Sequence, residues 1–106
     1  MIDWQDNDTY AQRRRFARRP VELPARLRVG REEITAVTEN ISPGGAFLRV
    51  KLPESTTEVL ASIVLPHGRD LHVRARVRWR RPGEPPGVGI EFETFLAGEV
   101  DLKLLR

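Results

Sequence analysis

The sequence predicts a mainly β fold, a small antiparallel β-barrel with one α-helix at its C-terminal end. About six short segments alternate apolar and polar residues, turn-forming residues separate them, and the C-terminal segment changes to near-helical spacing. With 106 residues and 40% hydrophobic content, the chain can form one domain with a modest core. We expect a flexible lead-in over residues 1–12 and the folded domain over residues 13–106.

The first strand is expected over Val21–Val29, where apolar and polar residues alternate with the period of two of a half-buried strand. Its apolar set is Leu23, Ala25, Leu27 and Val29. A glycine-containing turn leads into a second strand over Glu33–Ile41, and a third is expected over Ala46–Lys51. One side of the second strand is expected to carry Thr35, Val37 and Ile41. The polar segment between these two strands should therefore lie at the rim of the sheet.

A polar loop over 52–57 precedes a short apolar strand over Val59–Pro66, which a turn joins to a strand over Leu71–Arg80. This last strand has the clearest alternation in the chain. Its apolar residues are Leu71, Val73, Ala75, Val77 and Trp79. The residues between them are His72, Arg74, Arg76, Arg78 and Arg80. We expect the first set to face the core and the second to form a basic outer face.

The C-terminal part should add one strand and the helix. Pro82–Pro86 interrupts the alternation, and Val88–Phe92 restores it. In Phe95–Leu105, the residues Val100, Leu104 and Leu105 have near-helical spacing, which predicts a short terminal helix. Gly98 either weakens this helix or marks its start.

The most distinctive segment precedes the first strand and places five arginines in seven positions, Arg13-Arg14-Arg15-Phe16-Ala17-Arg18-Arg19. A guanidinium group is planar and always charged, so it can bind a phosphate through two nitrogens or lie against a base. Pro20 and Pro24 argue against a helix here, so we expect an extended, adaptable arm. The net charge is only +3, because acidic residues, Asp3, Asp6 and Asp8 among them, offset the arginines.

A second segment supplies groups that phosphate contacts alone do not provide. Asn40 has an amide that both donates and accepts hydrogen bonds, and Ser42 has a hydroxyl. The Gly44-Gly45 pair has a backbone that is free to adopt positive φ and to approach a ligand closely. A cluster of arginines together with such a polar turn indicates a nucleotide ligand with both phosphate and base.

These segments resemble the PilZ domain family, a bacterial receptor module for the second messenger cyclic di-GMP. The family pattern is Arg-x-x-x-Arg followed, after a strand, by Asp/Asn-x-Ser-x-x-Gly; it is filled here by Arg14, Arg18, Asn40, Ser42 and Gly45. The resemblance covers about residues 13–105 and includes the family's strand markers in their usual order. It implies a closed six-stranded antiparallel barrel in a stand-alone, single-domain protein.

The resemblance also implies a role for each matching residue. Arg14 and Arg18 would bind phosphate and the Hoogsteen edge of guanine, although an arginine run can also be only a solvated tail. Asn40 and Ser42 would bind the polar edge of a second guanine while also forming the turn. Gly45 would let the backbone approach the ligand.

Two further positions have roles that the family suggests. An arginine at the position of Arg13 tends, in the family, to accompany binding of an intercalated ligand dimer. Trp79 either stacks on a base of the ligand or packs in the core.

We therefore expect a receptor that orders its arginine arm on binding cyclic di-GMP and signals to a separate effector protein. One alternative is a PilZ-like interaction module that no longer binds nucleotide. Another is a basic nucleic-acid-binding barrel that uses the arginine face of Leu71–Arg80. The sequence disfavours nucleic acid, because the face that carries these arginines is expected to have no exposed aromatic residues to stack on bases.

Composition excludes several other classes. The chain has no cysteine and only two histidines, so we expect no metal site and no cofactor. It has no phosphate-binding GxxxxGK[ST] loop and no nucleophile–base set, so catalytic residues are not expected and an enzyme is disfavoured. No apolar run is long enough to span a membrane and the N-terminus does not resemble a secretory signal, so a cytoplasmic location without membrane contact is expected.

Overall fold

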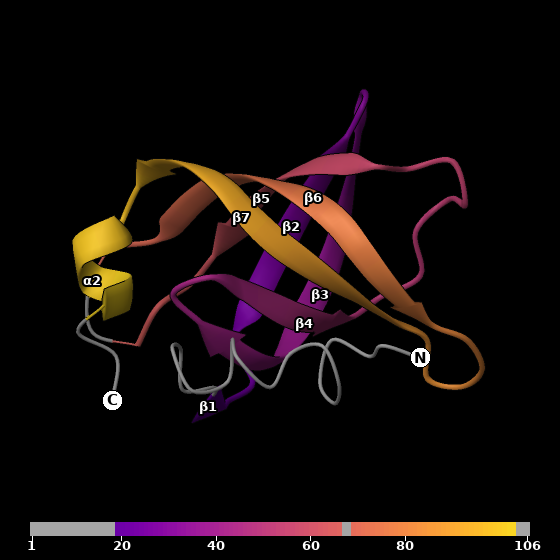
Figure 1. Cartoon of the computed structure of the whole chain (residues 1–106), viewed down its shortest axis with the longest axis horizontal. Coiled ribbons are helices and arrows are strands. Elements are labelled where there is room, and N and C mark those ends of the chain that lie inside the picture. The colour runs from indigo at the N-terminus through magenta and orange to yellow at the C-terminus, as the bar shows by residue number, and fades with distance from the viewer. Residues whose placement is uncertain (1–18, 67–68, 104–106) are drawn as a thin grey trace.

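The computed structural model describes residues 19–66 and 69–103. Within these ranges the chain forms strands and one short helix (Figure 1), with bounds β1 Arg19–Pro20, β2 Pro24–Val29, β3 Glu32–Ser42, β4 Gly45–Arg49, β5 Glu58–Ile63, β6 Leu71–Arg81, β7 Gly87–Ala97 and α2 Glu99–Lys103. The lead-in over 1–12, the arginines at 13–15 and 18, His67 and the last three residues lie outside the described residues.

The strands form a closed antiparallel barrel. The order β3-β2-β5-β6-β7-β4 is closed by pairing of β4 with β3, so the six longer strands enclose one core. β1 is an additional two-residue strand that pairs with the C-terminal half of β3, beyond the end of β2. The predicted six-stranded antiparallel barrel with a C-terminal helix is confirmed.

The interior is filled by the inward-facing apolar residues of all six strands, as period-two alternation requires. In β6, Leu71, Val73 and Ala75 are buried as predicted, and so are Leu23, Ala25 and Leu27 in and just before β2. Arg74 and Arg78, from the other face of β6, are exposed. This alternation shows that the sheet has one dry and one solvated face along most of its strands.

The prediction that Thr35, Val37 and Ile41 lie on one side of β3 is wrong. Ala36 and Thr38 are buried, whereas Thr35 is exposed and Val37 is half-buried. The register with β4 shifts between Thr38 and Asn40, a β-bulge that inserts one residue and changes the side to which later residues point. Ile41 is therefore buried together with Thr38, although the two are an odd number of residues apart.

The bulge region is held by a buried hydroxyl. Thr38 Oγ1 accepts a hydrogen bond from the Leu23 amide at 2.9 Å and donates one to the Val21 carbonyl at 2.5 Å. These contacts satisfy backbone groups in the gap between β1 and β2, where strand pairing is interrupted. The chain that continues from the arginine arm is thereby fixed against β3.

The terminal helix begins later than expected. Phe95–Ala97 belongs to β7, and α2 begins only after Gly98, which adopts a φ of +87°. Leu102 is the buried residue of α2 and Val100 is 70% exposed, so the predicted apolar side was wrong at Val100. Gly98 thus marks the start of the helix.

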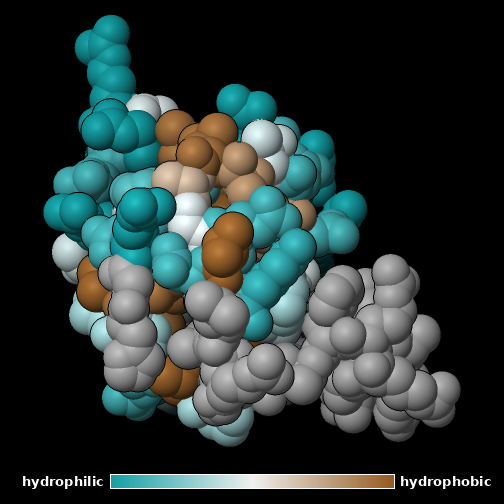
Figure 2. Space-filling view, turned by 90° about the vertical axis from the view of Figure 1, so that its left-hand side faces the viewer, coloured by the Kyte–Doolittle hydropathy of each residue, from teal (hydrophilic) through white to brown (hydrophobic). Residues whose placement is uncertain are grey.

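Figure 2 looks onto the side of the barrel that carries α2 and shows small brown patches enclosed by hydrophilic residues. Over the described residues, the large hydrophobic side chains that are exposed are Leu60, Val64, Leu96 and Val100. Isolated exposed apolar residues are normal on protein surfaces. The described surface therefore has no large group of exposed apolar side chains, and we expect the functional site among the polar groups.

Candidate functional site

The predicted polar turn connects β3 to β4, with Ser42 opposite Gly45 in the register. The Ser42 hydroxyl accepts a hydrogen bond from the Gly44 amide at 3.2 Å and donates one to the Gly45 carbonyl at 3.4 Å. Ser42 is buried. Its turn-forming role is therefore present in the structure, and its contact with a ligand stays a prediction.

The two glycines of the turn do not use the conformational freedom for which they were singled out. Positive φ among the described glycines occurs at Gly30, Gly83 and Gly98, and not at Gly44 or Gly45. Gly45 is buried because β4 pairs on both sides, with Ser42 in β3 and with Glu91 in β7. Gly45 serves close packing of three strands.

Asn40 contains the most unusual polar atom of the turn. Its Oδ1 is buried and has no hydrogen-bond partner in the part of the chain that the structure describes. Leaving a buried acceptor unsatisfied costs about 1–3 kcal/mol, so native proteins generally avoid it. Asn40 lies opposite Phe47 in β4 and opposite Pro20 in β1. This acceptor is therefore a candidate for a hydrogen bond from a ligand.

Arg13, Arg14 and Arg18, the other predicted site residues, lie outside the described residues. The segment that follows them is described: β1 begins at Arg19, which pairs with Ile41, and Pro20 pairs with Asn40. The arginine run is thus covalently joined to the strand that lies beside the polar turn. The structure brings together Asn40, Ser42 and Gly45, and it places Arg19, the C-terminal end of the arm, next to them.

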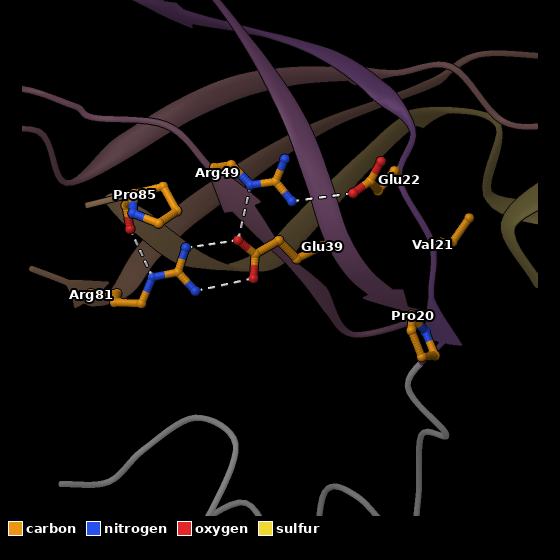
Figure 3. Close-up of a pocket in the computed structure, with 7 residues that line it drawn as sticks. All are labelled: Pro20, Val21, Glu22, Glu39, Arg49, Arg81 and Pro85. Atoms are coloured by element: carbon orange, nitrogen blue, oxygen red, sulfur yellow. Dashed lines mark hydrogen bonds and ion pairs between the residues drawn. The ribbon is translucent and has the colours of Figure 1, made fainter. Parts of the chain in front are cut away.

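A pocket of about 550 Å³ lies beside β1 (Figure 3). Its lining residues are Pro20, Val21, Glu22, Glu39, Arg49, Arg81 and Pro85. None of its charged residues was predicted from the sequence to be a site residue. Glu39 immediately precedes the Asn40 motif, which was the one local signal available. Arg81 is 42 residues away from Glu39 along the chain, so no spacing rule could have connected the two.

The strand register explains how these charges meet. Val37 pairs with Arg49, Arg49 with Gly87 and Gly87 with Arg81, so one row crosses β3, β4, β7 and β6. Gly87 has no side chain, and a Cβ there would lie 3.0 Å from Arg81 Nη2. Arg81 can therefore extend across β7 towards β3 and reach Glu39.

Glu39 is the centre of the charged cluster. Its Oε2 and Oε1 accept hydrogen bonds from Arg81 Nη2 at 2.7 Å and Nη1 at 3.1 Å, and Oε2 also accepts one from Arg49 Nε at 3.3 Å. The hydrogen bond from Arg81 is the main cause that holds the pKa of Glu39 below its ordinary value, and it raises the pKa of Arg81. Both groups therefore remain charged near neutral pH.

The two arginines differ in how firmly they are held. Arg81 also donates from Nε to the Pro85 carbonyl at 3.1 Å, and its guanidinium carbon lies 4.9 Å from the centre of the Phe47 ring. Arg49 donates from Nη2 to Glu22 at 3.3 Å, and this bond, followed by the one to Glu39, raises its pKa. The Arg49 side chain is 39% exposed and that of Arg81 31%, so Arg49 is the more accessible of the two cations, and its partner Glu22 is 70% exposed.

Trp79 packs against Phe47, with the ring centres 5.4 Å apart and the planes tilted by 48°. Phe47 is fully buried but is not part of the main core cluster, which contains its neighbours Ala46 and Leu48. Gly87 makes room for the Phe47 ring, because a Cβ there would lie 2.6 Å from it. Packing of Trp79 is thus present, and stacking on a ligand base stays a prediction.

Two of the four arginines on the basic face of β6 pair with carboxylates of the described residues. Arg76 pairs with Glu93 at 2.8 Å and with Glu58 at 3.3 Å, and Arg78 pairs with Glu91 at 2.6 Å. Arg80 donates to backbone carbonyls of the preceding loop, namely those of Leu52, Pro53, Glu54 and Thr56. The carboxylates beside Arg76 and Arg78 reduce the positive charge that a nucleic-acid backbone would meet on this face, which disfavours that alternative.

Within residues 19–66 and 69–103, no group of three or more His, Asp or Glu side chains is arranged to hold a metal ion. The same part of the chain contains no helix that is long and apolar enough to cross a membrane.

Comparison with known proteins adds a family match and two similar solved structures. The model of the family described as PilZ domain matches residues 12–106. The Bacillus subtilis inhibitor of motility MotI/DgrA superimposes with a TM-score of 0.74 at 26% identity, over 87% of this chain and 48% of that protein. The chain thus spans about half the length of MotI/DgrA. The PilZ domain of CeSA from a cellulose-synthesizing bacterium superimposes with a TM-score of 0.60 at 30% identity, over 80% of this chain and 89% of that domain. No curated protein sequence matches the chain.

Proposed function

Because the chain belongs to the PilZ domain family, we propose that it is a cytoplasmic receptor that binds cyclic di-GMP reversibly, performs no catalysis and signals to an effector protein. PilZ domains form a family of cyclic di-GMP receptors, and they act as ligand-binding modules rather than enzymes. The proposal for this chain adds the particular residues that bind the ligand and the change that binding produces.

The observation that carries the proposal is the buried Oδ1 of Asn40, which has no hydrogen-bond partner among the described residues. A guanine base presents N1–H and N2–H as donors on one edge, and an amide oxygen is a matching acceptor. Binding of guanine would satisfy an atom that has no partner within residues 19–66 and 69–103, which makes the contact favourable. Ser42, whose hydroxyl contacts within the turn measure 3.2 and 3.4 Å, would support this edge, and Gly45 would keep the turn compact.

The arginine arm supplies the phosphate contacts in this proposal. Arg14 and Arg18 bind the phosphates and the Hoogsteen edge of guanine, where O6 and N7 accept hydrogen bonds. Arg13 provides a further cation for a second stacked ligand molecule. The position of β1 supports this assignment, since the residue directly after Arg18 pairs with Ile41 and the next one with Asn40.

Signalling would follow from the change in the arm. A ligand that contacts both the arm and the turn favours the state in which residues 10–19 are ordered against the barrel. The ordered arm together with the bound ligand forms a surface that does not exist without the ligand. An effector protein that recognises this surface would bind only when cyclic di-GMP is present.

Isothermal titration calorimetry with cyclic di-GMP at near-physiological salt tests the proposal, with GTP and single-stranded DNA as control ligands. Saturable binding at micromolar concentration or tighter is expected, and its molar ratio reports whether one or two ligands bind. Arg14→Ala and Arg18→Ala should each remove most of the affinity. Arg28→Ala is the matched control, because Arg28 is exposed on β2 and does not line the pocket.

Wild-type affinity in both arm variants would overturn the proposed binding mode. Absence of cyclic di-GMP binding would favour a PilZ-like interaction module. Binding of single-stranded DNA that falls steeply with salt, without selectivity for cyclic di-GMP, would favour a nucleic-acid-binding barrel.

A further inference from the structure

We propose that Arg49 is an additional ligand-binding residue of the pocket in Figure 3 and that Glu22 blocks it until an anionic ligand displaces the carboxylate. This inference rests on the proposed function and extends it, because the anion would be a phosphate of cyclic di-GMP. Glu22 would thereby set the concentration at which the receptor responds.

The first step is to separate the two arginines of the pocket. Arg81 uses Nε, Nη1 and Nη2 in hydrogen bonds to Pro85 and Glu39, and its guanidinium packs against Phe47. A ligand could reach Arg81 only by breaking several of these contacts together. Arg81 is therefore a structural residue that fixes Glu39.

Arg49 is held differently. Its contacts to Glu39 and Glu22 are both 3.3 Å long, and its Nη1 takes part in no hydrogen bond to the described residues. Glu22 lies in the segment between β1 and β2 rather than in a strand, and its side chain is 70% exposed. Exposed ion pairs of this kind contribute little net stability, so exchanging Glu22 for another anion is easy.

The remaining contact would orient Arg49 for a ligand. Glu39 binds Nε, which leaves Nη1 and Nη2 as the pair of donors that can bind two phosphate oxygens at once. Glu39 itself is anchored by Arg81, and its side chain is only 24% exposed, so it would stay in place when Glu22 moves. Figure 3 shows Arg49 between the two carboxylates, with Glu39 on one side and Glu22 on the other.

The location fits a phosphate of the proposed ligand. Pro20 lines the pocket and pairs with Asn40, so the pocket adjoins both the proposed guanine-binding turn and the C-terminal end of the arginine arm. A molecule in which Glu22 is paired with Arg49 cannot bind a phosphate at Arg49, so only the fraction of molecules in which this pair is open can accept the ligand there. The apparent affinity is reduced by that fraction.

A double-mutant cycle tests the inference by calorimetric titration of cyclic di-GMP into the wild type, Glu22→Gln, Arg49→Gln and the double variant. Glu22→Gln should tighten binding about three- to fivefold, since an exposed ion pair no longer competes. Arg49→Gln should weaken binding about tenfold, because a charge-assisted contact is lost. In the Arg49→Gln background, Glu22→Gln should have no effect.

Glu58→Gln is the matched control. Glu58 contacts Arg76 Nη2 at 3.3 Å, the same distance as between Glu22 and Arg49, and it does not line the pocket. It changes the net charge by the same amount, so wild-type affinity is expected. Thermal unfolding of every variant establishes that it is folded.

Each other outcome has a distinct meaning. If Glu22→Gln raised the affinity for cyclic di-GMP equally in the wild type and in the Arg49→Gln variant, the effect would be a general one of charge. This result would overturn the proposed block of Arg49 by Glu22. An unchanged affinity in Glu22→Gln would overturn it as well, while wild-type binding would leave the receptor function intact. Absence of binding to the wild type would overturn the receptor function and this inference with it.

Discussion

Glu39 holds Arg81 with both carboxylate oxygens, at 2.7 and 3.1 Å, and so links β3 to the end of β6 although the two strands are not neighbours in the barrel. The link passes over Gly87 in β7 and closes one side of the pocket. The contribution of the Glu39–Arg81 pair to the free energy of unfolding can be measured without a ligand.

Glu39→Gln should lower the free energy of unfolding by about 1–2 kcal/mol, because a bidentate, partly buried, charge-assisted contact is replaced by a neutral one. Urea denaturation followed by tryptophan fluorescence measures the change. Glu91→Gln, which removes the exposed pair with Arg78, is the control and should have a smaller effect. Equal losses in the two variants would contradict a special role for the Glu39–Arg81 pair.

The same pair should make stability depend on pH. Arg81 lowers the pKa of Glu39 below its ordinary value of 4.5, so the stabilisation is fully present above about pH 4.5. It is lost as the pH falls through the lowered pKa, because the carboxyl then takes up a proton. Urea denaturation at several values between pH 3 and 7 gives the free energy of unfolding as a function of pH. This free energy should change less steeply with pH in Glu39→Gln than in the wild type. Parallel curves would mean that other carboxyl groups cause the acid sensitivity.

Asn40→Ala should weaken cyclic di-GMP binding and leave the stability of the free protein unchanged or slightly higher. The variant removes a buried acceptor that has no partner among the described residues, so no hydrogen bond between described residues is lost on folding. The ligand, in contrast, would lose its hydrogen bond to the Asn40 oxygen. Calorimetric titration and urea denaturation give the two numbers. A loss of stability by more than about 1 kcal/mol would show that Asn40 has a structural role instead.

Thr38→Val should lower the free energy of unfolding by about 2–3 kcal/mol, since it removes the partner of the Leu23 amide and of the Val21 carbonyl in a buried site. The control is Thr35→Val, which makes the same chemical change at an exposed position of β3. Urea denaturation of both variants provides the comparison. A similarly small effect for both would rule out the proposed role of the Thr38 hydroxyl.

Gly87→Ala should destabilise the protein by about 1–3 kcal/mol, because the new methyl group would lie 2.6 Å from the Phe47 ring and 3.0 Å from Arg81 Nη2. Phe47→Leu in the same chain should recover part of the loss by making room. The fluorescence of Trp79, which packs on Phe47, reports the rearrangement. Absence of any recovery would locate the strain at Arg81 rather than at Phe47.

The sequence allowed the barrel and most strands to be predicted, since burial on one side imposes a period of two that is plain in Leu71, Val73 and Ala75. It did not reveal the bulge between Thr38 and Asn40, because Thr35 and Val37 suit an inward side as well as Ala36 and Thr38 do. The bulge is determined by pairing with β4, which local patterns do not contain. The prediction that Thr35 and Val37 lie on the same side of β3 as Ile41 was therefore wrong.

In the candidate site, too, local patterns could be read from the sequence, whereas contacts that depend on strand pairing could not. Asn40, Ser42 and Gly45 could be predicted because they are close together in the chain and share turn chemistry. The cluster of Glu39, Arg49 and Arg81 could not, because it depends on a row of pairings across four strands and on the missing side chain of Gly87. Contacts of this kind are a property of the closed barrel.

The pairing of β1 with β3 also determines the range over which the arm can act. Arg14 is joined to Arg19 by five peptide bonds, and five residues of extended chain span at most about 18 Å. For the proposed receptor, a tether this short would give the arm's guanidinium groups an effective concentration at Asn40 of the order of millimolar or higher. A ligand bound to the turn would then meet the arm in an intramolecular step, and the rate of that step would not depend on the protein concentration.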